Sequence, residues 1–116
     1  MSTAPASSLL TDLQYQQAAS SLLTRIETTV DRWLQDDVID IDTQRTGGLL
    51  ELAFPDGSKI IVNTQPPLHE VWLATRAGGF HYRYAEGLWR DTRDGSEFFA
   101  VLSHNASQQA GTALNF

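Results

Sequence analysis

Apolar residues follow a helical spacing from about Leu10 to Leu34. They recur at steps of three and four residues and fall within an arc of about 120° on a helix. Neither glycine nor proline interrupts the segment, so the pattern predicts one long helix with one buried side. The members of this stripe are Tyr15, Ala19, Leu22, Leu23, Ile26, Val30, Trp33 and Leu34.

Beyond this helix the apolar period changes to two, which is typical of strands. In the segment 38–43, Ile39 and Ile41 point one way while Asp40 and Asp42 point the other. Further strands are predicted at 49–54, 59–63, 70–74, 80–84 and 88–90. Glycine and proline turn signals separate them, at Gly47-Gly48, Pro55-Asp56-Gly57, Pro66-Pro67, Gly78-Gly79 and Glu86-Gly87.

A second, shorter helix is predicted from Phe98 to near Gly111. Before it, Asp94 is expected to cap the first turn while Glu97 reaches back. Strands joined by short turns must be antiparallel, and such a sheet needs cover on one face only. The predicted fold is therefore α+β: a two-layer sandwich in which the N- and C-terminal helices cover one face of about six antiparallel strands. A large apolar residue on the open face would then be informative.

The length of 116 residues fits a single domain over 1–116, with the small polar residues 1–8 expected to be flexible. There are 14 acidic and 8 basic residues and no cysteine. The missing thiols exclude disulfides, thiolate metal sites and a cysteine nucleophile. The net charge of −6 argues against nucleic acid as a partner. No basic, apolar leader and no apolar stretch of membrane length is seen, so we expect a cytoplasmic protein without membrane contact.

Six of the acidic residues lie between positions 27 and 42, against Arg32 as the single base. Hard cations such as Ca²⁺, Mg²⁺, Mn²⁺ and iron prefer oxygen ligands of this kind. Two other interpretations stay open: a solvated face that aids solubility, and a charged surface that steers a basic partner protein. The six are Glu27, Asp31, Asp36, Asp37, Asp40 and Asp42.

Trp72 alternates with Val71 and Leu73 in its predicted strand. If those two neighbours face the helices, Trp72 lies on the open face, near the polar side chains of Asn63 and Gln65. An exposed tryptophan beside amides is typical of a protein-binding anchor. The alternative is that long neighbours half cover it.

Catalytic signatures are missing from the sequence. It contains no glycine-rich phosphate loop, no G-x-S-x-G and no H-E-x-x-H. The spacing of His69, His81 and His104 forms no readable triad. We therefore expect no enzymatic activity.

The segment from Asn63 to Tyr82 resembles the frataxin family, most closely its bacterial (CyaY-type) branch. It carries the pattern N-x-Q-x-P-x-x-x-x-W, in which Asn63, Gln65, Pro67 and Trp72 are the fixed positions. A Gly-Gly pair and an aromatic-His-aromatic run follow at 78–82. Gly47-Gly48, the run from Asp56 to Ile61, Trp89 and the helix start at 94–97 also fit, so the resemblance covers about residues 10–112.

This resemblance implies an iron-binding protein that assists and regulates iron–sulfur cluster assembly. Fe²⁺ and Fe³⁺ would bind weakly along an acidic ridge, with other divalent cations as alternatives. The protein would dock on the cysteine desulfurase and the iron–sulfur scaffold protein, using Trp72 supported by Asn63 and Gln65. We expect a monomer, with an iron-dependent oligomer as the alternative state. Carried over by position, the acidic ridge consists of Glu27, Asp31, Asp36, Asp37, Asp40 and Asp42.

Two other functions are weighed against this one. The chain could be an iron-independent interaction module whose acidic face modulates a basic partner. A ferroxidase-type activity, attributed to parts of the wider family, is disfavoured because no Glu-x-x-His di-iron pattern is visible.

Overall fold

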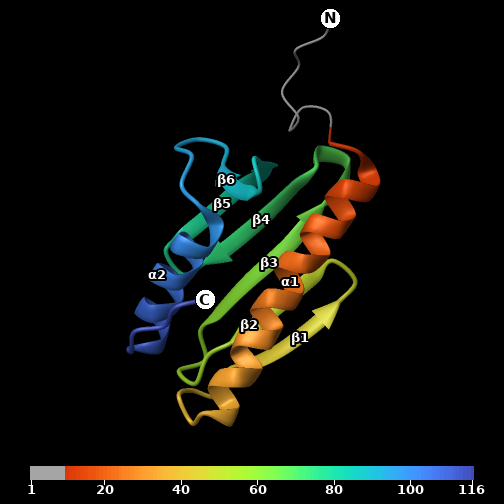
Figure 1. Cartoon of the computed structure of the whole chain (residues 1–116). Coiled ribbons are helices and arrows are strands. Elements are labelled where there is room, and N and C mark those ends of the chain that lie inside the picture. Colours follow the sequence, from red (N-terminus) through yellow and green to blue (C-terminus); the bar gives the residue numbers. More distant parts are fainter. Residues whose placement is uncertain (1–9) are drawn as a thin grey trace, which may run out of the picture.

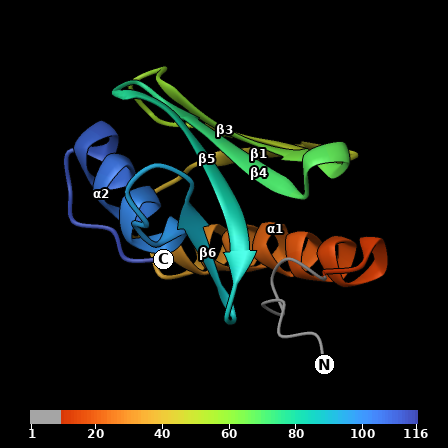
Figure 2. The same cartoon turned by 90° about the horizontal axis from the view of Figure 1, so that it is seen from above.

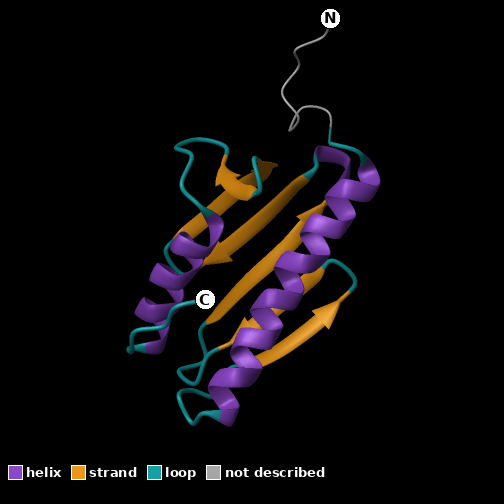
Figure 3. Cartoon of the chain, in the orientation of Figure 1, coloured by secondary structure: helices purple, strands orange, loops and turns teal. Residues whose placement is uncertain are grey.

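The computed structural model describes residues 10–116. The segment 1–8, predicted to be flexible, lies outside the described residues. The chain runs as one long helix, six strands and a second helix, with a short 3₁₀ turn after the third strand (Figures 1 and 3). The elements are α1 (Asp12–Gln35), β1 (Asp42–Thr46), β2 (Leu49–Ala53), β3 (Lys59–Gln65), η2 (Pro66–Leu68), β4 (Glu70–Thr75), β5 (Gly78–Ala85), β6 (Leu88–Asp91) and α2 (Phe98–Ala110).

The six strands form one sheet in the order β1-β2-β3-β4-β5-β6, and every neighbouring pair is antiparallel. Figure 2 shows α1 and α2 on the same side of this sheet. The α+β prediction is therefore confirmed, with two helices over one face and the other face open. No helix among residues 10–116 has the length and apolar character needed to cross a membrane.

The core lies between the helices and the covered face of the sheet. Strand alternation sends Leu50 and Leu52 of β2 and Ile60 and Val62 of β3 into it. Val71 and Leu73 of β4 point the same way, so Glu70, Trp72 and Ala74, which alternate with them, face the open side. Trp89 of β6 is also buried. The largest fully buried side chains include Tyr15, Tyr82, Phe98, Leu23 and Ile26.

Helix α1 begins two residues after the predicted start. Thr11 is its N-cap: the Thr11 hydroxyl accepts from the backbone N–H of Gln14, and the Gln14 side chain accepts from the backbone N–H of Thr11. The predicted stripe is buried except at its last position. Leu34 is 54% exposed.

The first strand is shorter and later than predicted, since β1 begins at Asp42 and not at Val38. The reason is the end of α1: Asp37 adopts a positive φ of 60°, and the Val38 N–H bonds to the Trp33 carbonyl at 2.8 Å. Residues 38–41 then connect the helix layer to the sheet layer. Ile41 is buried without being part of the strand, and Asp40 is exposed, so the alternation was interpreted correctly while the strand was not.

The capping of α2 also differs from the prediction. Glu97 itself is the N-cap, because its carboxylate accepts from the backbone N–H groups of Phe99 and Ala100. Asp94 instead stabilises the preceding turn by accepting from the N–H of Ser96.

Candidate functional site

The acidic ridge follows one end of the molecule, from the last turns of α1 through the connection into β1 (Figure 1). Asp36 is the C-cap of α1, and Asp37 has the left-handed backbone that ends the helix. Asp40 lies in the connection and Asp42 opens β1. All ridge members are exposed except Glu27, which is half-buried.

Glu27 differs from the other ridge members because it has a partner. Its Oε1 accepts from Nη1 of Arg45 at 2.7 Å, which links α1 to β1. Among residues 10–116, the other five carboxylates form no ion pair within 4.0 Å. The uncompensated charge of the ridge therefore belongs to Asp31, Asp36, Asp37, Asp40 and Asp42.

These carboxylates do not converge on one point. Within the part of the chain that the structure describes, no three His, Asp or Glu side chains form a group that could hold a metal ion. A cation attracted here would find one or two carboxylate oxygens at a time and would keep several of its waters. The described part of the ridge therefore offers separate carboxylate oxygens rather than a closed coordination site.

The second predicted surface lies on the open face of the sheet. Strand register places Asn63 of β3 opposite Trp72 of β4, and Trp72 opposite His81 of β5. The Trp72 and His81 rings are stacked, with centroids 4.3 Å apart and an interplanar angle of 9°. Trp72 therefore lies on the open face, as predicted, and is half covered by a neighbour, while its role as a binding anchor stays a prediction.

Gln65 lies at the end of β3 and is half-buried. Its backbone N–H donates to the Tyr15 hydroxyl at 3.0 Å, and that hydroxyl donates to the backbone carbonyl of Glu70 at 2.6 Å. Burial raises the pKa of Tyr15, so the phenol stays protonated and can donate. The end of β3 and the start of β4 are thereby attached to α1.

Three residues of this face were not singled out from the sequence as site residues: Glu70, His81 and Arg83. Glu70 is 6% exposed and accepts from both the Trp72 indole and the Arg83 guanidinium, each at 2.9 Å. Glu70 stands two positions before Trp72, so strand alternation alone places it on the same face. The sequence therefore indicated the face on which Glu70 lies, but it did not indicate that the Glu70 carboxylate is buried.

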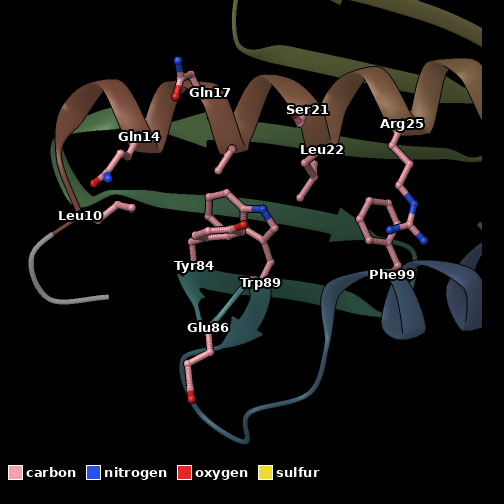
Figure 4. Close-up of a pocket in the computed structure, with 12 residues that line it drawn as sticks. Leu10, Gln14, Gln17, Ser21, Leu22, Arg25, Tyr84, Glu86, Trp89 and Phe99 are labelled. Carbon is pink, nitrogen blue, oxygen red and sulfur yellow. The ribbon is translucent and has the colours of Figure 1, made fainter. Parts of the chain in front are cut away.

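A separate groove of about 590 Å³ lies on the helix side, between α1 and the β5–β6 hairpin (Figure 4). Its apolar floor includes Tyr84 and Trp89, and the Arg25 guanidinium lies over the Phe99 ring at 3.7 Å from its centroid. The groove is on the covered side of the sheet and shares no residue with the ridge or with the Trp72 face.

Comparison with known proteins shows that this chain is similar to the members of one family. A sequence model of the frataxin-like domain matches residues 8–112. The iron-sulfur cluster assembly protein CyaY of Polaromonas sp. (strain JS666 / ATCC BAA-500) is 53% identical over 107 residues, covering 92% of each chain. The protein of the same name from Burkholderia mallei (strain SAVP1) is 51% identical over 107 residues, covering 92% of this chain and 98% of that one.

Solved structures agree with the sequence relatives. Frataxin from Psychromonas ingrahamii has a TM-score of 0.79 at 38% identity, covering 90% of this chain and 95% of its own. Trimeric frataxin from the yeast Saccharomyces cerevisiae, complexed with ferrous iron, has a TM-score of 0.69 at 21% identity, covering 82% of this chain and 87% of its own. The yeast protein shares the fold alone at this identity. Since the family model spans nearly the whole chain and relatives share about half of its residues, the chain belongs to the frataxin-like family.

Proposed function

We propose that this protein assists and regulates iron–sulfur cluster assembly, holding Fe²⁺ or Fe³⁺ weakly along the acidic ridge. The observation that carries the proposal is the set of five ridge aspartates that have no basic partner within residues 10–116, on a chain of this family. The curated relatives are named for iron–sulfur cluster assembly, and a solved yeast frataxin is complexed with ferrous iron. Iron is cargo in this account.

The chemistry of the ridge suits a transient holder of iron. Carboxylate oxygens are hard ligands that bind iron and other divalent cations without thiolate selectivity. The chain has no cysteine, so the sulfur chemistry must take place on a partner. We therefore assign the protein no turnover reaction of its own and place it in the cytoplasm.

The proposed partners are the cysteine desulfurase and the iron–sulfur scaffold protein. The contact would be formed by Trp72 with Asn63 and Gln65, since Trp72 is a large, half-buried side chain on the open face of the sheet. The ridge and this face lie on different parts of the molecule. Iron binding and scaffold docking can therefore be disabled separately.

A reconstituted assembly reaction tests the proposal. It contains cysteine desulfurase, scaffold protein, cysteine and Fe²⁺, and cluster formation is followed by absorbance. The protein should change the rate of cluster formation in a way that depends on iron concentration. The double variant Asp40→Asn/Asp42→Asn should lose most of that iron dependence, whereas Glu86→Gln, a carboxylate outside the ridge, should keep it. Equal rates with and without the protein would refute the proposed function.

The alternative is an iron-independent interaction module, and one observation favours it: the described carboxylates form no three-ligand group. In that case the ridge would serve to attract a basic partner. Desulfurase activity, measured as alanine formed from cysteine with and without Fe²⁺, separates the two functions. Under the alternative, the protein changes desulfurase activity equally with and without iron.

A further inference from the structure

Glu70 is an unusual residue for an open sheet face. Its neighbours on that face are half-buried or exposed, yet only 6% of Glu70 is accessible. A buried carboxylate is costly unless its oxygens are hydrogen-bonded and its charge is compensated. The Glu70 carboxylate is therefore expected to have hydrogen-bond donors and a positive charge beside it.

Both carboxylate oxygens are used. Oε1 accepts from Nε1 of the Trp72 indole at 2.9 Å, and Oε2 accepts from Nε of Arg83 at 2.9 Å. Nδ1 of His81 stands 3.9 Å from Oε1, and the His81 ring stacks on the indole. Glu70 thus sits at the centre of a group in which β4 supplies the tryptophan and β5 supplies the histidine and the arginine.

We propose that Glu70 is the positioning residue of the docking surface: its carboxylate fixes the orientation of the Trp72 indole, and Arg83 holds the carboxylate in place. This inference rests on the proposed function, in which Trp72 contacts the scaffold protein. A tryptophan ring on an open face can turn about its side-chain torsions. The bond to Nε1–H and the stacked imidazole restrict it to one orientation, so less conformational freedom is lost when a partner binds.

Two matched pairs of variants isolate this role. Glu70→Gln keeps an oxygen acceptor for the indole, whereas Glu70→Met has similar size and no such acceptor. Arg83→Gln removes the support of the carboxylate. Arg90→Gln, directly opposite Arg83 in the neighbouring strand, changes the same charge without touching Glu70.

The first readout is the indole N–H resonance of Trp72 in ¹⁵N-labelled protein, assigned with Trp72→Phe. In Glu70→Met this resonance should move upfield and exchange faster with water, while Glu70→Gln should retain its protection. Arg83→Gln should accelerate the exchange and Arg90→Gln should not. If Glu70→Met fails to fold, the comparison of Arg83→Gln with Arg90→Gln still tests the proposal. An unchanged Trp72 indole in Glu70→Met, or equal effects of the two arginine variants, would overturn the proposal.

The second readout is the affinity for the scaffold protein, measured by calorimetry. Glu70→Met should weaken binding by about tenfold, the scale of one lost hydrogen bond to a charged group. Glu70→Gln should retain most of the affinity of the parent protein. Equal weakening by both would contradict the positioning role. If Trp72→Ala leaves scaffold binding intact, the docking surface of the proposed function is wrong, while the indole resonance still judges the role of Glu70.

Discussion

Two buried tyrosines hold their hydroxyl groups in opposite situations. The Tyr15 hydroxyl both donates and accepts, joining α1 to the end of β3 and the start of β4. The Tyr82 hydroxyl is buried and has no hydrogen-bond partner among residues 10–116, and its pKa is raised mainly by that burial. The first hydroxyl stabilises the fold, whereas the second is desolvated without gaining a bond.

Removal of each hydroxyl should therefore have a different effect on stability. Tyr15→Phe leaves the buried N–H of Gln65 and the Glu70 carbonyl without this partner, and should lower the free energy of unfolding by about 1–3 kcal/mol. Tyr82→Phe should leave it unchanged or raise it by about 1 kcal/mol. Urea unfolding of both variants beside the parent protein measures the difference. Similar losses in the two would contradict this account.

For single residues, the sequence predicts which side chains cluster or lie on the open face better than it predicts which side chains bond to each other. The ridge acids and Trp72 were found because charge density and strand alternation are visible in one dimension. The pairing of Glu27 with Arg45 was not, because it joins a helix to an edge strand 18 positions later. The Glu70 bonds depend on side-chain orientations that an alternating pattern does not specify.

Among the elements, the helices and turns were predicted closely, and the errors lie where two layers meet. A period of two over 38–43 indicated a strand, but the first four of those residues connect α1 to the sheet. Alternating burial arises wherever an extended chain passes over a core, with or without a hydrogen-bonded neighbour. The tail after α2 likewise has no periodic pattern, although Leu114 and Phe116 pack on the core.

The C-terminal tail should contribute to stability through Leu114. Its side chain is 4% exposed, its N–H donates to the Ser107 hydroxyl, and that hydroxyl donates to the Leu114 carbonyl. Leu114→Ala should lower the free energy of unfolding by about 2–3 kcal/mol, as for other buried leucines. Thr112→Ala, at an exposed position of the same tail, should change it little. Chemical denaturation checks both, and a small effect of Leu114→Ala would show that the tail is dispensable.

The turn between β2 and β3 should be sensitive to acid. Hydrogen bonds from the Ser58 hydroxyl and N–H lower the pKa of Asp56 below its ordinary value of 3.8. A lowered pKa in the folded state means that the carboxylate stabilises the fold at neutral pH and loses this effect as the pH falls below about 4.

Asp56→Asn should therefore reduce stability at pH 7, and the deficit should shrink as the pH falls from about 5 to 3. Thermal unfolding at several pH values measures it. A deficit of constant size across that range would show that the charge of Asp56 has no part in the turn.

Over the whole molecule, the fold places the acidic ridge and the Trp72 face on different surfaces. The helices cover one face of the sheet and leave the other open (Figures 1 and 2). The covered face holds the core, Trp72 lies on the open face, and the ridge carboxylates lie at the end of α1 and the start of β1. The layered architecture was predictable from two amphipathic helices and short turns. That the ridge forms no closed site was not, because it depends on the positions of side chains in space.

Five unpaired carboxylates should make the stability of the whole molecule depend on cations. A cation that binds the folded state alone, at ten times its Kd, adds about 1.4 kcal/mol, which is about 5 °C in Tm for a chain of this size. Millimolar divalent cation should thus raise the Tm of the parent protein and of Glu86→Gln. It should raise the Tm of Asp40→Asn/Asp42→Asn by less. Identical melting curves across the cation range would argue against binding at the ridge.

Iron should bind along the acidic ridge, and an anaerobic Fe²⁺ titration of ¹⁵N-labelled protein locates the binding residue by residue. The backbone amide signals of residues 27–42 should broaden first, those of α2 should persist, and Asp40→Asn/Asp42→Asn should suppress the broadening. If the signals around His69 and His81 broaden while those of 27–42 stay unchanged, iron binds elsewhere and the account is wrong.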